Sequence, residues 1–405
     1  MEQINNNFYD LGIAPKILEL LDKMKFKVPT PIQQKSIPIA IEGKDIIGVA
    51  QTGTGKTLAF GIPMVQRLTQ DGMLGLVLVP TRELALQVDE TIRKLGQSFG
   101  FKTAVLIGGA SMHNQIKAIR LQPKIVIATP GRLIDHLEQR TIRLDHVGIL
   151  VLDEADRMLD MGFAPQINKI LGHVPTKRQT MLFSATIPNK IVQIATQHMQ
   201  LPVSVEIAKS GTAAKNVTQE LFIVKKEEKG QLLTKLLYDS RGTVLLFCRT
   251  KRGASRIAKE LKKLGFNTAE IHSDRSLNQR REALDGFKMG KYRILVATDI
   301  AARGIDVKEI ELVINFDLPD DSENYVHRIG RTGRAGHTGR AISLATPDQR
   351  NEVLSIEKIM HKALPISKHP ELGLAAFAAP QVRSFKPRSK RFGRGIPSRP
   401  RRFGR

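Results

Sequence analysis

The segment from Ala50 to Thr57, with the sequence AQTGTGKT, contains the residue types that hold nucleotide phosphates. Its glycines allow backbone N–H groups to approach phosphate oxygens, and the helix expected to follow would present its positive end to the same anion. Lys56 is placed to reach the β- and γ-phosphates, and the Thr57 hydroxyl is placed to ligate Mg²⁺. We therefore expect phosphate binding by Gln51, Thr52, Gly53, Thr54, Gly55, Lys56 and Thr57.

Ala50 stands where the general form of this pattern has Gly. The position of the segment, between an apolar strand and a helix start, still favours a phosphate loop.

An acidic cluster, Asp153-Glu154-Ala155-Asp156, directly follows the apolar run from Ile149 to Leu152. A carboxylate at the carboxyl end of a parallel strand lies at the ligand-binding edge of the sheet. Asp153 is predicted to take Mg²⁺ through water, and Glu154 to polarise the attacking water. Alone, such a cluster is more often a solvated turn or helix cap. Its place after a strand and downstream of the phosphate loop favours catalysis.

A basic cluster from His327 to Arg334, with the sequence HRIGRTGR, lies in the second half of the chain. That half has no Gly-Lys-Thr loop of its own, and the corresponding turn reads Cys248-Arg249-Thr250-Lys251. One ATP site is therefore expected. Arginines of this cluster would reach its γ-phosphate across a cleft, because phosphoryl transfer needs positive charge as the transition state forms. In isolation, the cluster would more often be an exposed charged face or a phosphate-contact patch.

Short apolar runs alternate with helix-like stretches such as 82–95, which predicts doubly wound α/β domains with mainly parallel sheets. The small, polar segment 208–216 reads as a linker. The predicted boundaries are a first domain at 1–207, a second at 217–364 and a disordered basic tail at 365–405. The expected strands are 46–49, 76–79, 104–107, 125–128, 149–152 and 180–183, then 244–247, 269–271, 294–297, 312–315 and 341–344.

The 405-residue chain carries a formal net charge of +24, and its last 25 residues hold ten Lys or Arg and no acid. A basic body with a more basic tail indicates a polyanionic partner such as nucleic acid, although such a tail can also serve solubility alone. Cys248 is the only cysteine, which excludes an intrachain disulfide and a cysteine-rich metal site. The polar start and the lack of a long apolar run favour a cytoplasmic protein without a membrane segment.

Together these motifs resemble those of the DEAD-box ATP-dependent RNA helicases, with bacterial RhlE-like members as the nearest subgroup, over roughly residues 8–364. The resemblance implies two tandem RecA-like domains, ATP and Mg²⁺ as ligands, and RNA as partner. It also implies that Gln33 hydrogen-bonds the adenine edge within the segment that contains Phe26, and that Phe8 stacks on the base. Without the resemblance, Gln33 would pass for a surface residue and Phe8 for a core residue.

The same resemblance assigns the remaining roles. RNA contacts would come from Arg82, Gly109, Thr129, Arg132, Arg249, Thr298 and Asp299. Ser184, Thr186 and His327 would couple hydrolysis to strand separation, Asp306 would lie near the ribose, and Arg331 and Arg334 would be the arginine fingers. Two positions depart from the family pattern: Lys25 replaces a usual Gly, and Leu277 replaces a usual Gln, which puts one interdomain or RNA contact in doubt.

The implied activity is local unwinding or remodelling of RNA duplexes and RNA–protein complexes, with little sequence specificity. Phe385, Phe392 and Phe403 alternate with arginines in the tail, which predicts extra RNA affinity. The alternatives are a DNA helicase or translocase and an ATP-gated RNA clamp or annealing chaperone; a small-molecule kinase would not explain the second domain. Ribosome assembly, mRNA decay and cold adaptation are all compatible with the sequence, and ribosomal or RNA-decay proteins are candidate partners.

Overall fold

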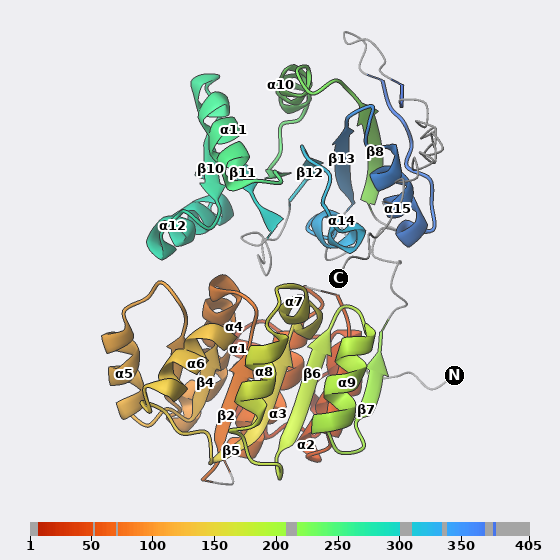
Figure 1. Ribbon diagram of the computed structural model, residues 1–405. Helices are drawn as coiled ribbons and strands as arrows, with labels where there is room; N and C mark the ends of the chain where they lie inside the picture. Colours follow the sequence, from red (N-terminus) through yellow and green to blue (C-terminus); the bar gives the residue numbers. More distant parts are fainter. Residues whose placement is uncertain are drawn as a thin grey trace, which may run out of the picture.

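The computed structural model describes residues 7–51, 53–69, 72–207, 217–299, 310–333, 338–368 and 376–377. Two parallel sheets, each covered by helices on both faces, form two α/β domains (Figure 1). This confirms the predicted fold class. Within the described part of the chain, no helix is long and apolar enough to cross a membrane.

The sheet of the first domain has the strand order β3-β4-β2-β5-β6-β1-β7, and every described pairing is parallel. The strands are β1 (Ile46–Val49), β2 (Leu74–Leu78), β3 (Thr103–Leu106), β4 (Ile125–Ala128), β5 (Val147–Asp153), β6 (Gln179–Ser184) and β7 (Val203–Glu206). The helices are α1 (Pro15–Lys23), α2 (Pro31–Ile41), α3 (Lys56–Leu68), α4 (Arg82–Gly96), α5 (Met112–Arg120), α6 (Pro130–Glu138), α7 (Ala155–Asp160), α8 (Ala164–Leu171) and α9 (Asn189–His198), with 3-10 turns at Tyr9–Leu11 and Gln97–Phe99.

Neighbouring residues of a strand pack into opposite core layers, because successive side chains point to opposite faces of a sheet. In β2, Val77 joins the layer formed with α1 to α4, whereas Leu76 and Leu78 join the layer formed with α6 to α9. Strands buried on both faces need apolar residues at every position, which is why their runs are continuous in the sequence.

The second domain has the strand order β10-β11-β9-β12-β13-β8, again with parallel pairings. One core layer lies under α10 and α11 and the other under α12, α14 and α15. The strands are β8 (Val217–Ile223), β9 (Val244–Phe247), β10 (Thr268–Ile271), β11 (Ile294–Ala297), β12 (Leu312–Asn315) and β13 (Gly339–Ala345). The helices are α10 (Lys229–Asp239), α11 (Lys251–Lys263), α12 (Leu277–Lys288), α14 (Ser322–Ile329) and α15 (Arg350–Met360).

All the expected strands are present, and the structure adds two, β7 and β8, that the sequence reading missed. Both are edge strands, and their residues alternate between buried and exposed at several positions. A strand with one solvated face lacks the continuous apolar run used to find the others.

The second domain extends slightly beyond Leu364. The Leu221 N–H donates to the Pro365 carbonyl at 2.8 Å, and the Ser367 N–H donates to the Leu221 carbonyl at 2.8 Å. Phe377 packs against the core layer that contains α15. The predicted linker and the rest of the predicted tail lie outside the described residues.

Candidate active site

The phosphate loop connects β1 to α3 at the carboxyl edge of the first sheet. Gly53 and Gly55 have φ angles of 86° and 88°, a backbone region that favours glycine. A Cβ at Gly55 would clash with the side-chain amide of Gln33, so this position also requires glycine for space. The Thr54 hydroxyl donates to the Gln51 carbonyl at 2.7 Å, which closes the turn. Thr52 lies outside the described residues.

Lys56 is the first residue of α3 and is only 5% exposed. Its Nζ has no hydrogen-bond acceptor among the described residues. A buried ammonium without an acceptor is costly, and a phosphate oxygen would remove that cost. Half-buried Thr57 follows it on the same turn. These residues therefore fit the predicted ATP phosphates.

Gln33 contacts the phosphate loop rather than solvent. Its Nε2 donates to the Gly55 carbonyl at 3.0 Å, and its Oε1 accepts from the Thr30 N–H at 2.9 Å, which completes a capping box at the start of α2. The adenine contact stays a prediction. Phe8 is 3% exposed and lies in the core, so stacking on a base would require its ring to leave the core. Phe26 is 40% exposed.

Asp153 and Glu154 lie at the end of β5 and are both buried. The Glu154 N–H donates to Asp153 Oδ1 at 2.9 Å. Burial raises the pKa of Asp153 to about 6; the nearby Lys56 ammonium opposes this rise, and the Glu154 charge adds to it. A cation bound here would favour the charged carboxylate. Glu154 has a φ of 52°, and a non-glycine residue in that region costs about 1–3 kcal/mol.

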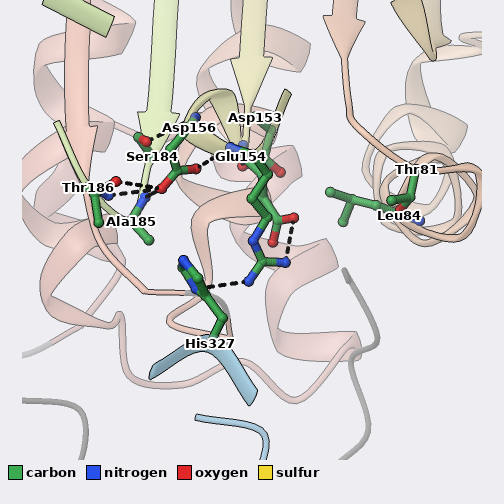
Figure 2. A network of polar contacts seen from close by, with 10 residues as sticks. Thr81, Leu84, Asp153, Glu154, Asp156, Ser184, Ala185, Thr186 and His327 are labelled. Atoms are coloured by element: carbon green, nitrogen blue, oxygen red, sulfur yellow. Dashed lines mark hydrogen bonds and ion pairs between the residues drawn. The ribbon is translucent and has the colours of Figure 1, made fainter. Parts of the chain in front are cut away.

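Asp156 links the loops that follow β5 and β6 (Figure 2). Its Oδ2 accepts from the N–H groups of Ala185 and Thr186 at 3.0 Å each, and from the Thr186 hydroxyl at 3.1 Å. The Asp156 N–H donates to the Ser184 hydroxyl at 3.2 Å. The structure thus brings both first-domain residues predicted to couple hydrolysis into contact with the acidic cluster.

The second domain reaches this cluster through His327 of α14 (Figure 2). Arg157 Nη1 donates to Glu154 Oε2 at 3.0 Å, and Arg157 Nη2 lies 3.1 Å from His327 Nδ1. Burial and the adjacent Arg157 charge lower the pKa of His327 to about 3, so its ring is neutral near pH 7. Arg331 is buried after the end of α14. Arg334 and Asp306 lie outside the described residues.

Arg328 has a different role from its neighbours in the basic cluster. Its guanidinium forms two hydrogen bonds of 2.6 Å with the Asp299 carboxylate and donates to the Asn315 side chain at 3.1 Å. It also lies over the Phe247 ring. Asp299, predicted to contact RNA, is therefore engaged within the second domain, and its RNA contact stays a prediction.

The first-domain RNA candidates lie close together. A side chain at Gly109, where φ is 74°, would clash with the Arg82 guanidinium. Arg132 Nη1 donates to the Ala110 carbonyl at 3.1 Å. Burial lowers the pKa of Arg82, and the nearby Arg280 and Arg132 charges lower it further, as expected where cations gather. Thr129 is buried and precedes α6.

The second-domain candidates are less concentrated. Arg249 donates from Nη2 to the Leu318 carbonyl at 3.2 Å, and its Nε lies 3.2 Å from an Asp320 carboxylate oxygen. Thr298 follows β11, and its N–H donates to the Ile271 carbonyl at 3.3 Å. The RNA contacts of Arg249 and Thr298 stay predictions.

An ion pair joins the domains beside the RNA candidates. Arg280 Nη2 of α12 donates to Glu83 Oε2 of α4 at 2.8 Å, and both side chains are buried. On the same helix, Leu277 packs against the core of the first domain. The departure from the family pattern therefore places an apolar side chain at the interdomain contact.

Glu83→Gln is expected to weaken closure of the two domains, because Arg280 would lose its charged partner in a buried contact. A hydrogen bond to a charged group contributes about 1.5–3 kcal/mol, so RNA affinity in the presence of a non-hydrolysable ATP analogue should fall about 10–100-fold. Fluorescence anisotropy with labelled RNA measures this. Glu42→Gln, which removes an exposed pair with Lys44 in the first domain, is the matched control. Equal affinities for the two variants would contradict the interpretation.

Comparison with known proteins agrees with this geometry. The "DEAD/DEAH box helicase" family model matches residues 30–194, and the "Helicase conserved C-terminal domain" model matches residues 228–336. The "ATP-dependent rRNA helicase RRP3" of Debaryomyces hansenii is 44% identical over 368 residues, covering 90% of this chain and 77% of the relative. The "DEAD-box ATP-dependent RNA helicase CshA" of Bacillus subtilis is 42% identical over 378 residues, covering 93% and 76%.

This chain belongs to the DEAD-box ATP-dependent RNA helicases. The structure of S. cerevisiae Dbp5 bound to RNA and ADP BeF3 is similar to this helicase, with a TM-score of 0.81 and 29% identity over 89% of this chain and 95% of that one. The predicted RecA-like architecture and the RNA-helicase activity of the family are thereby confirmed. The RhlE-like subgroup stays a prediction.

The sequence reading of this DEAD-box helicase missed three buried residues that connect the site. The sequence reading gave Asp156 no role beyond membership of the motif. In the structure, its carboxylate accepts hydrogen bonds from the backbone of Ala185 and Thr186 in the loop after β6. Arg157 follows the motif directly, and its spacing of three residues from Glu154 was the signal available. Glu83 directly follows Arg82, a predicted RNA contact, but its partner Arg280 is 197 residues away.

Proposed function

We propose that this helicase hydrolyses ATP at the carboxyl edge of the first sheet and uses the second domain to complete the site. The proposal depends on one observation: Lys56, Asp153 and Glu154 are buried together, and Lys56 has no acceptor among the residues that the structure describes. His327 of the second domain reaches Glu154 through Arg157. The phosphate loop and Lys56 bind the phosphates. Thr57 and Asp153 would hold Mg²⁺, which neutralises phosphate charge.

Glu154 orients the attacking water and accepts its proton, since a carboxylate within hydrogen-bond reach serves as a general base. Arg331, with Arg334, supplies positive charge to the transferring phosphoryl group as the domains close. RNA and ATP both favour the closed form, so each raises the affinity for the other. The Glu83–Arg280 pair supports the same closed form because it joins the domains directly.

The proposed nucleic-acid substrate is structured or duplex RNA. Arg82, Gly109, Thr129 and Arg132 would contact its backbone from the first domain, and Arg249 and Thr298 from the second. Backbone and 2′-hydroxyl contacts give a preference for RNA with little sequence specificity. Ribosomal RNA is the first target to test, because a relative carries the name of an rRNA helicase. Partners in RNA decay and a cytoplasmic location stay predictions from the sequence.

We infer from the sequence that the segment 381–405 adds RNA affinity through its ten Lys and Arg residues. Deleting it is expected to weaken RNA binding by about tenfold or more at low salt, and to flatten the slope of log K against log salt. Anisotropy titrations over a salt series measure both. An unchanged slope would contradict a tail that binds RNA. The KM for ATP without RNA, which does not depend on the tail, is the control.

Steady-state ATPase activity tests the proposal. The rate is measured without nucleic acid, with single-stranded RNA and with DNA of matched sequence, each in Mg²⁺ and in EDTA. Strong stimulation by RNA alone, lost in EDTA, is expected. Equal stimulation by DNA would favour the DNA-helicase alternative. RNA binding gated by ATP without turnover would favour an RNA clamp.

A further inference from the structure

Arg157 is the charged side chain through which the two domains meet at the catalytic carboxylate. It lies on α7, is 1% exposed and is among the largest fully buried side chains of the described residues. Removing a guanidinium from water costs several kcal/mol, so a buried one is stable only where acceptors surround it. The acceptors found here are Glu154 in its own domain and His327 in the other.

The chemistry of these groups fixes the direction of each hydrogen bond. A guanidinium has only donors, so the contact at 3.1 Å requires an unprotonated Nδ1 on His327. Two separate nitrogens of one rigid fork, Nη1 and Nη2, serve the two partners. A lysine ammonium is a single point and lacks this geometry. The arrangement therefore depends on arginine and on a ring acceptor at Nδ1.

The backbone conformation of Glu154 is strained, so the position of its side chain depends on contacts with neighbouring residues. With a φ of 52°, this residue is held in a conformation that surrounding contacts must maintain. Arg157 contacts the carboxylate at Oε2. His327 comes from α14 of the second domain, so its contact with Arg157 exists only when that domain lies against the first.

We propose that Arg157 is a positioning residue that links the Glu154 carboxylate to His327, so that the general base is correctly oriented only in the closed enzyme. The inference rests on the proposed function and extends it. Arg157 converts domain closure, which RNA promotes, into orientation of the water-activating carboxylate. A purely structural alternative is that Arg157 only neutralises the charges of Asp153, Glu154 and Asp156, in which case His327 would be irrelevant to its effect.

A double-mutant cycle separates these roles. Arg157→Gln, His327→Ala and the double variant are compared for kcat with saturating RNA and for the unstimulated rate. Each single change is expected to lower the RNA-stimulated kcat about tenfold. The double variant should lose no more than the more affected single variant, because both changes break the same link. RNA stimulation should fall more than the unstimulated rate.

Two further variants sharpen the test. His327→Asn keeps an acceptor near the position of Nδ1 and should retain more activity than His327→Ala. Arg157→Lys keeps the positive charge but loses the two-nitrogen geometry of the guanidinium, and it should behave like Arg157→Gln. If Arg157→Gln does not fold, Arg157→Lys takes its place in the double-mutant cycle. Arg143→Gln, which removes an exposed arginine paired with Asp145, is the matched control and should leave activity unchanged.

Losses that multiply in the double variant, or equal losses with and without RNA, would overturn the inference. Failure of the proposed function is distinguishable, since the wild-type enzyme would then show no stimulation by RNA. Thermal unfolding of each variant separates loss of folding from loss of orientation.

Discussion

Replacing Glu154 with Gln is expected to lower the RNA-stimulated kcat about 10²–10⁴-fold, the usual contribution of a general base. The amide has the shape of the carboxylate and can still accept a hydrogen bond from Arg157, but it cannot take a proton from water. Binding should survive, because Lys56 and the phosphate loop are untouched. A coupled ATPase assay gives kcat, and titration with a fluorescent ATP analogue gives affinity.

The control for this substitution is Glu138→Gln, which removes an exposed carboxylate of the same domain that is paired with Lys169. Its kcat should equal that of the wild type. A Glu154→Gln enzyme that keeps kcat within about tenfold of the wild type would show that another group activates the water.

Arg331→Ala is expected to lower the RNA-stimulated kcat about 10³–10⁵-fold, the range measured for arginines that stabilise phosphoryl transfer. Arg331 is buried directly after α14, the helix that carries His327. Because this arginine belongs to the second domain, ATP binding by the first domain should change much less than kcat. Single-turnover hydrolysis in saturating RNA, with ATP-analogue titration alongside, measures the difference.

Arg340→Gln is the matched control, since Arg340 lies in β13 of the same domain and forms a partly exposed pair with Glu220. It should retain full kcat. If Arg331→Ala raised the KM for ATP without lowering kcat, Arg331 would contribute to binding alone and the arginine-finger role would be wrong.

Composition and periodicity were sufficient to predict the interior strands, because strands such as β4 and β9 are apolar at every position. The edge strands β7 and β8 were missed for the opposite reason. Their solvated faces accept polar residues, so the runs Val203–Glu206 and Val217–Ile223 look like ordinary loop sequence.

Motifs predicted the groups that carry the chemistry but not the contacts among them. Arg157 and His327 are 170 residues apart, and nothing in either segment specifies the other. Phe8 shows a related limit: the sequence predicts base stacking but not that the ring packs into the core of the first domain, and the stacking stays a prediction. Long-range packing decides such cases.

Leu277 stands where the family pattern usually has Gln, and only the structure shows what this change does. The usual Gln at this position suggested a lost contact, yet Leu277 packs against the first-domain core, and Arg280 three residues later pairs with Glu83. Residues three apart on a helix share a face, so one side of α12 supplies both an apolar and an ionic contact between the domains.

Strand displacement from a short RNA duplex tests the central claim most directly. A duplex of about 10 base pairs with a fluorescent strand is incubated with enzyme and Mg²⁺·ATP, beside a DNA duplex of matched sequence and a Glu154→Gln control. We predict ATP-dependent release of the RNA strand, little release from DNA, and no multiple-turnover release by the variant. Release that needs no ATP, or that is equal for DNA, would contradict an ATP-driven RNA helicase.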